Sequence, residues 1–165
     1  MEDWIAPDPV ALHAQGRPEK LALFDLATGR RWTYAALDRG IDQAVAALAA
    51  LGLVAGGRIA ALARNSADLL IIHLAAMRMG AIFVPLNWRL APAELAPILA
   101  DCAPQLLVGD GTVTVETPAG CRALSLPDLA AAVEAAIPVS NRPLRSARTP
   151  CVILYTSGTS GVPKG

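Results

Sequence analysis

The last ten residues of the chain carry the side chains whose types and spacing best suit chemistry. Residues 156–165 hold four hydroxyl groups, three glycines and one lysine, Lys164. Glycines allow successive backbone N–H groups to turn into one concavity, which binds anions. The hydroxyls add neutral donors, and the lysine adds a compact positive charge. This inventory is the one needed to hold a polyphosphate.

Two common phosphate-binding motifs do not fit this segment. A Walker loop that begins at Gly158 requires its second glycine where Pro163 stands. The dinucleotide fingerprint fails as well, because the segment contains no two glycines separated by one residue. A flexible tail without function is the alternative interpretation. The run Cys-Val-Ile-Leu-Tyr at 151–155 argues against it, since it predicts a buried strand that leads directly into the segment.

The elements that must position this segment follow a repeating pattern. Apolar runs at 58–63, 81–85 and 105–109 predict strands. Helical patterns lie between them, one beginning after Asn65-Ser66 and ending at Gly80, the other running from Pro92 to about residue 101. Strands that alternate with helices predict a parallel sheet that is covered on both faces.

The flanking regions predict further elements. Residues 1–20 are a polar lead-in, 21–25 and 31–34 can pair as a hairpin, and Thr33 can cap a helix that ends at Gly52. Beyond the repeats, 112–115 alternates like a strand, and Ser125 can cap a helix over 126–137. We therefore expect an α/β fold, a partial parallel sheet with flanking helices, preceded by a β-hairpin and helix. The expected divisions are 1–52, 53–137, a linker at 138–150, and the strand with its loop at 151–165.

Composition narrows the functional classes. The 165 residues carry 14 basic and 14 acidic side chains, so the chain has no electrostatic footprint for nucleic acid. Apolar residues make up 54%, which excludes global disorder. The chain shows no signal peptide and no membrane span. Its three cysteines show no zinc or disulfide spacing. We expect buried free thiols and a cytoplasmic protein.

The segment 155–165, Tyr-Thr-Ser-Gly-Thr-Ser-Gly-Val-Pro-Lys-Gly, resembles the phosphate-binding loop of the adenylate-forming enzymes. These include acyl-CoA synthetases, adenylation domains of peptide synthetases and luciferase-type enzymes. Upstream blocks at 31–37, 58–66 and 80–90 are similar to those of the same family in order and spacing. The last block, with Asn-Trp-Arg-Leu at 87–90, is typical of the acyl-CoA synthetases. Ala36 departs from the family, in which many members have glutamate.

The resemblance implies a two-step, ATP-dependent acid–thiol ligation. A carboxylic acid attacks the α-phosphate of ATP, which gives an acyl-adenylate and pyrophosphate, and a thiol, commonly that of coenzyme A, then takes the acyl group. In the family this loop grips the β- and γ-phosphates, while Mg²⁺ offsets charge. By position, this role falls on Thr156, Ser157, Gly158, Thr159, Ser160, Gly161 and Lys164.

The resemblance also implies that much is missing. Full members continue for several hundred residues, so we expect an N-terminal fragment that is inactive alone. A cut sheet leaves an open strand edge and an apolar face, so we expect self-association. Two rivals stay open: a stand-alone nucleotide-binding or interaction module, and an adenylation domain of a peptide synthetase.

Other polar residues receive simpler interpretations. We expect His73 to be a packed histidine, and Asp101 and Asp110 to be solvated or to cap elements. Trp88 and Arg89 follow the carboxyl end of a predicted strand, where they can line a ligand channel or simply pack. The arginines of 142–148 are expected to belong to a solvated linker.

Overall fold

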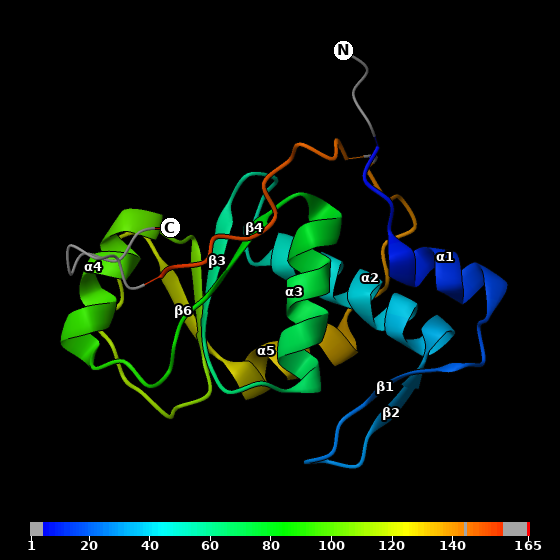
Figure 1. Ribbon diagram of the computed structural model, residues 1–165, viewed down its shortest axis with the longest axis horizontal. Coiled ribbons are helices and arrows are strands. Elements are labelled where there is room, and N and C mark those ends of the chain that lie inside the picture. Colours follow the sequence, from blue (N-terminus) through cyan, green and yellow to red (C-terminus); the bar gives the residue numbers. More distant parts are fainter. Residues whose placement is uncertain (1–4, 144, 157–164) are drawn as a thin grey trace.

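The computed structural model of the chain describes residues 5–143, 145–156 and 165 (Figure 1). Each helix and strand predicted between residues 34 and 109 is present within two residues of its expected bounds. In chain order the elements are α1 (Pro9–Gly16), β1 (Leu21–Phe24), β2 (Arg31–Thr33), α2 (Tyr34–Ala50), β3 (Arg58–Leu62), α3 (Ala67–Met79), β4 (Ile82–Pro85), α4 (Pro92–Cys102), β5 (Leu106–Gly109), β6 (Arg122–Ser125) and α5 (Leu126–Ala135).

A four-stranded parallel sheet forms the centre, in the order β4-β3-β5-β6. Its register places Ile59 of β3 beside Phe83 of β4 on one side and beside Leu106 of β5 on the other. Strands β1 and β2 form a separate antiparallel hairpin. The predicted fold class, a partial parallel sheet with flanking helices after a hairpin and helix, is therefore confirmed.

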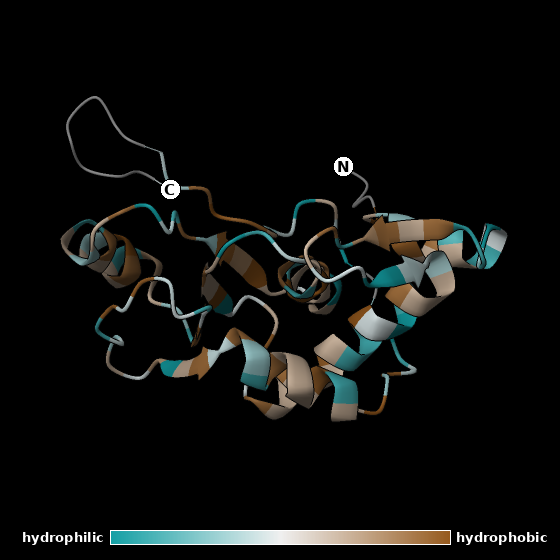
Figure 2. Cartoon of the chain, turned by 90° about the horizontal axis from the view of Figure 1, so that it is seen from below, coloured by the Kyte–Doolittle hydropathy of each residue, from teal (hydrophilic) through white to brown (hydrophobic). Residues whose placement is uncertain are grey.

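Side chains of the sheet alternate between two apolar cores, because successive residues of a strand point to opposite faces. Ile59 and Ala61 of β3 join the core that α2, α3 and α5 cover, whereas Ala60 and Leu62 join the core that α4 covers. Figure 1 shows α3 and α4 on opposite sides of the sheet, and Figure 2 shows its brown strands in the middle of the molecule. Helix α2 shares an apolar core with the sheet, so the two predicted regions, 1–52 and 53–137, pack together here. Their division at residue 52 stays a prediction about the organisation of a larger protein.

Three predicted helix caps are present. The side chains of Thr33, Ser66 and Ser125 accept hydrogen bonds from backbone amides three residues later, at the starts of α2, α3 and α5. Such caps satisfy amides that have no partner inside the helix. At the other end of α3, Gly80 adopts a left-handed conformation with φ 78°, which glycine reaches without steric cost.

The strand predicted at 112–115 is wrong, and the fourth strand lies at Arg122–Ser125 instead. The carboxylate of Asp110 accepts the backbone N–H of Thr112 at 2.8 Å, which turns the chain away as soon as β5 ends. Val113 and Val115 pack against the α4 core from outside the sheet. Alternation predicted an exposed strand here, but it cannot show whether a partner strand is available.

The lead-in at 1–20 contains a helix that the sequence did not reveal. Asp8 caps α1 by accepting the amide of Ala11 at 3.0 Å, and Pro9 occupies the first helical position. No residue of α1 is buried, so the helix lacks the apolar stripe by which an amphipathic helix is recognised.

The predicted strand at 151–155 is only partly regular. It pairs in parallel with the free edge of β4 through one bridge, between Phe83 and Val152. The expectation of a solvated 138–150 linker is also wrong in one respect. Arg142 lies against α2 and forms ion pairs with Asp38 and Asp42 at 2.7 and 2.5 Å.

Candidate functional site

The loops that follow the parallel strands lie along one edge of the sheet. The turn that precedes α3 follows β3, residues 86–91 follow β4, and Asp110 follows β5. The segment 151–155 runs parallel to β4, so Thr156 leaves the sheet at the same edge. In open α/β sheets, ligands bind outside the carboxyl ends of the strands. The predicted phosphate loop therefore begins where this fold places ligands.

Two backbone hydrogen bonds fix the segment that leads to the loop. Phe83 donates its N–H to the carbonyl of Cys151 at 2.9 Å, and Ile153 donates its N–H to the carbonyl of Phe83 at 3.0 Å. The side chains then alternate. Val152 packs against the core of α2 and α3, while Ile153 and Tyr155 pack against the core of α4.

Tyr155 adds a side-chain tether immediately before the loop. Its phenol donates a hydrogen bond to Oδ2 of Asp101, near the end of α4. Burial raises the pKa of Tyr155, and the hydrogen bond to Asp101 raises it further. Asp101 was expected to be solvated or to cap a helix, and its partner was missed because Tyr155 is 54 positions away in the sequence.

Among the predicted phosphate ligands, Thr156 is exposed at the end of this segment. Ser157, Gly158, Thr159, Ser160, Gly161 and Lys164 lie outside the described residues, so their role stays a prediction. Gly165 is described and lies against the same segment. A Cβ atom added to it would come within 2.7 Å of Ile153 Cγ2 and 2.8 Å of Tyr155 Cζ. A larger residue at position 165 would therefore have to displace the Ile153 or Tyr155 side chain.

Trp88 and Arg89 occupy the loop after β4, as expected. The guanidinium of Arg89 lies over the Trp88 ring, 4.2 Å from its centre, and the Arg89 amide donates to Oδ1 of Asn87 at 3.0 Å. Trp88 also packs against the α4 core. The pair therefore forms a cationic surface at the carboxyl edge of the sheet, and its contact with a substrate stays a prediction.

Asp110 ties the loops after β3 and β5 together. It accepts hydrogen bonds from the amide and side chain of Arg64 at 2.8 and 3.4 Å, and from the amide of Thr112. Burial would raise the pKa of Asp110, but these hydrogen bonds outweigh burial and lower it to about 2. Asp110 was expected to be solvated or to cap an element, and its carboxylate instead binds Arg64 and the turn after β5.

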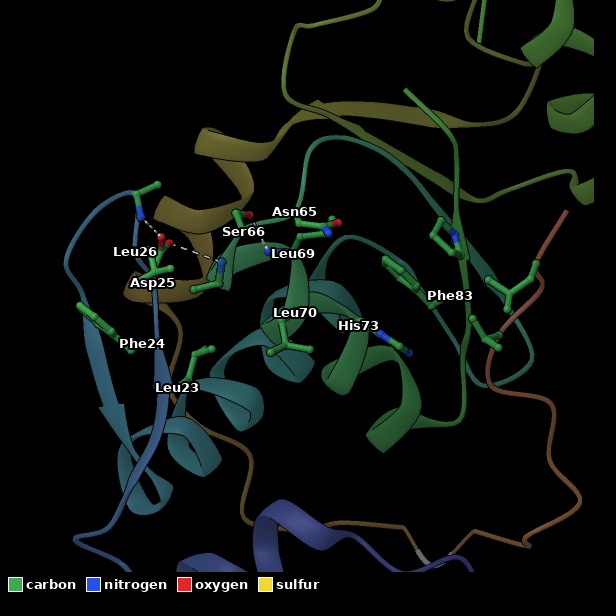
Figure 3. A pocket seen from close by; sticks show the side chains of 15 residues that line it. Leu23, Phe24, Asp25, Leu26, Asn65, Ser66, Leu69, Leu70, His73 and Phe83 are labelled. Atoms are coloured by element: carbon green, nitrogen blue, oxygen red, sulfur yellow. Dashed lines mark hydrogen bonds between the residues drawn. The ribbon is translucent and has the colours of Figure 1, made fainter. Parts of the chain in front are cut away.

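A groove of about 790 Å³ opens beside the 151–155 segment (Figure 3). Its walls come from the β1–β2 hairpin, the first turns of α3, and the edge formed by β4 and Leu154. Within it the His73 ring stacks on Phe83, with ring centres 4.6 Å apart and planes at 11°. Burial lowers the pKa of His73, as expected for a packed histidine. Four stretches that are distant in the sequence line the groove, so no local pattern predicted it.

The cysteines are free thiols, as expected. Cys102 is buried, and burial, followed by the charge of Asp101, raises its pKa to about 11, so it is protonated at neutral pH. Cys121 and Cys151 are half-buried rather than buried.

In residues 5–143 and 145–156, no cluster of three or more His, Cys, Asp or Glu residues has the geometry of a metal site. Across the same residues, no helix combines the length and the apolar character that crossing a bilayer requires.

Comparison with known proteins places these features in a family. The profile of the family described as "AMP-binding enzyme" matches residues 10–165. The indoleacetate–CoA ligase of Aromatoleum aromaticum is 35% identical over 93% of this chain, which corresponds to 32% of that ligase. The hybrid PKS-NRPS synthetase pydA of an Acremonium species is 35% identical over 90% of this chain, but the match covers 4% of that synthetase.

A solved structure agrees with the sequence matches. The N-terminal domain of FACL13 from Mycobacterium tuberculosis superposes with a TM-score of 0.85 at 26% identity, over 94% of this chain and 41% of that one. The chain thus spans less than half the length of each of these relatives. The match through residue 165 includes the predicted phosphate segment, and it shows that the chain belongs to the AMP-binding enzyme family.

Proposed function

We propose that the chain is the N-terminal part of an ATP-dependent, adenylate-forming enzyme, and that residues 156–164 bind the β- and γ-phosphates of ATP. The observation that carries this proposal is the course of 151–156. Two backbone hydrogen bonds with Phe83, and the hydrogen bond from the Tyr155 phenol to Asp101, place Thr156 at the carboxyl edge of a parallel sheet. A segment rich in glycines, hydroxyls and one lysine begins at that point.

In the proposed reaction, a carboxylate oxygen of the substrate attacks the α-phosphorus of ATP. The bond between the α-phosphorus and the bridging oxygen breaks, and pyrophosphate leaves with the electron pair. Backbone amides, hydroxyls and Lys164 would hold the β- and γ-phosphates in line and stabilise the charge that develops on the leaving group. Mg²⁺ bound to the phosphates would offset part of their charge.

We propose that the second substrate is a thiol and that coenzyme A accepts the acyl group. The Asn-Trp-Arg-Leu run at 87–90 and the similarity to a CoA ligase favour this acid–thiol ligase. A peptide-synthetase adenylation domain is the second candidate, which the similarity to a hybrid PKS-NRPS synthetase favours. There the acceptor would be the thiol of a carrier protein. Free thiols at all three cysteines suit a reducing, cytoplasmic location.

We also propose that the 165-residue chain is inactive alone and self-associates. Because Cys151 and Ile153 bond to β4, the backbone groups of Val152 and Leu154 point away from β4. The side chain of Leu154 is 60% exposed beside the apolar groove. An open edge next to apolar surface favours pairing with a second copy.

Pyrophosphate release tests the proposed function. We expect the longer protein that contains this chain to release pyrophosphate from MgATP only when a carboxylic acid is present. With its acid it should consume coenzyme A and form a thioester, whereas consumption of carrier-protein thiol alone would favour the second candidate. The 165-residue chain should show no turnover. Turnover by this chain alone, or ATP hydrolysis that ignores every carboxylate, would contradict the proposal.

A further inference from the structure

An ion-pair cluster fastens the segment that leads to the phosphate loop. Arg78 of α3, only 4% exposed, forms ion pairs with Asp8, Asp38 and Asp42 at 2.8, 2.7 and 2.9 Å. Asp38 and Asp42 lie one turn apart on α2, where two like charges repel each other. Arg142 reaches the same two aspartates from the segment that returns from α5. The aspartate pair therefore holds a buried arginine on one side and the return segment on the other.

The contact made by Arg142 is specific in geometry. Its Nε donates to Asp42 Oδ1 at 3.1 Å, and its Nη2 donates to Asp42 Oδ2 at 2.5 Å and to Asp38 Oδ2 at 2.7 Å. This two-pronged contact with Asp42 uses the planar fork of the guanidinium, which a lysine cannot reproduce. The Asp42 side chain is 8% exposed and the Arg142 side chain 33%, so screening by salt is reduced at the Asp42 end of the contact.

Downstream of Arg142, the chain contacts the N-terminal lead-in before it meets β4. Ala6 donates its amide to the carbonyl of Arg145 at 2.7 Å, and Ile5 forms a bridge with Ser146. The segment then makes its two backbone hydrogen bonds with Phe83. Two backbone bonds alone define the register weakly, because a shift by two residues keeps every side chain on its own face.

Such a shift would matter at the loop. Two residues of a parallel strand span about 6.6 Å, so a slip would displace Thr156 by that distance along β4. A ligand site whose donors move by this much no longer matches its ligand. An anchor upstream and a second contact downstream would oppose such a slip. Arg142 lies upstream of the paired segment, and Tyr155 lies at its downstream end.

We propose that Arg142 is a positioning residue: its ion pairs with Asp38 and Asp42 fix the point from which the chain runs to β4, and they thereby set the register of 151–155 and the place of the phosphate loop. The statement about register stands on these contacts alone. Only its consequence for phosphate binding rests on the proposed function.

Hydrogen exchange of individual amides tests the register. We expect Arg142→Gln to reduce protection of the Phe83 and Ile153 amides at least tenfold, while the amides of Ile41 and Ile72 in the main core change less than threefold. Arg142→Lys keeps the charge and should recover part of the lost protection. Arg30→Gln is the matched control, because Arg30 pairs with Asp68 at 2.6 Å and is 38% exposed, compared with 33% for Arg142.

The outcomes separate the two claims. Unchanged protection at Phe83 and Ile153 in Arg142→Gln would overturn the positioning role, and so would an equal loss at Ile41 and Ile72. If Arg142→Gln does not fold, Asp38→Asn takes its place with the same expectation, because it removes the negative charge at one of the contacts made by Arg142.

Titration with magnesium pyrophosphate measures the consequence for phosphate binding. We expect a tenfold weaker affinity in Arg142→Gln and an unchanged affinity in Arg30→Gln. Wild-type chain that binds no pyrophosphate would overturn the proposed loop function, while exchange alone decides the register.

Discussion

The phenol of Tyr155 donates a hydrogen bond to the carboxylate of Asp101, and this contact joins the residue before Thr156 to helix α4. Tyr155 and Ile153 both pack against the apolar core that contains Cys102, the residue next to Asp101. The tether orients the chain at the point where Thr156 leaves the sheet.

This contact predicts an unusual titration for Tyr155. In a Tyr34→Phe variant, Tyr155 is the single tyrosine, and its absorbance should titrate above the ordinary value of about 10. Burial raises the pKa, and the nearby carboxylate adds to it, so Asp101→Asn in the same background should lower the midpoint. Because the pKa of Tyr155 is higher in the folded chain than in the unfolded one, the protonated phenol stabilises the fold below pH 10. This stabilisation is lost as the pH rises through the pKa of the folded chain. A midpoint at or below 10 in the intact fold would show that the phenol is free.

The buried arginine of α3 predicts a large stability effect. Arg78→Leu removes the ion-pair partner of Asp8 and leaves Asp38 and Asp42 paired with Arg142 alone, and breaking buried pairs of this kind costs about 3–5 kcal/mol. Urea denaturation measures the loss. Arg30→Leu is the control, since its more exposed pair with Asp68 is worth about 0–1 kcal/mol. Equal losses in the two variants would mean that the cluster contributes no more than a surface pair.

Acid stability should depend on Asp110. Its folded pKa of about 2 lies below the value of 3.8 for a free aspartate, so its stabilising effect is complete above the unfolded value and is lost as the pH falls through the folded one. We expect the wild-type chain to lose stability between about pH 4 and pH 2. The Asp110→Asn variant should be less stable than the wild type at neutral pH, and its free energy of unfolding should fall less steeply as the pH is lowered. Parallel pH profiles of the two proteins would contradict this assignment.

The open edge predicts an association that one substitution weakens. The average mass of the wild-type chain in light scattering should rise with protein concentration. Leu154→Glu places a charge on the exposed edge and should shift the chain toward monomer. Leu12→Glu is a matched control, because Leu12 is 59% exposed on α1, compared with 60% for Leu154. A clean wild-type monomer at high concentration would exclude self-association.

Short-range sequence patterns predicted the helices that begin with a capping residue. Caps at Thr33, Ser66 and Ser125 and the apolar period between them located α2, α3 and α5. Strand β6 was missed because its burial pattern is mostly exposed and its identity depends on pairing with β5. Helix α1 was missed because none of its residues is buried.

The contacts that position the candidate site depend on tertiary structure. Arg142 meets Asp42 across 100 positions of sequence, and Tyr155 meets Asp101 across 54. In a stretch rich in proline and serine, the sequence alone predicts that an arginine side chain is exposed to solvent. Only the packing of the return segment against α2 makes Arg142 structural. The composition of 156–165 predicted the class of ligand, whereas the means of fixing the loop in place could be found only in the fold.

Calorimetric titration of the 165-residue chain with magnesium pyrophosphate tests the central claim most directly. We predict weak, millimolar binding of pyrophosphate and of MgATP, no detectable binding of AMP, and at least a tenfold loss in Lys164→Ala. Lys20→Ala is the control, because Lys20 is the other lysine of the chain and lies far from 156–165 in sequence. Binding of AMP as strong as that of pyrophosphate, or an affinity that Lys164→Ala leaves unchanged, would contradict a polyphosphate site in this segment.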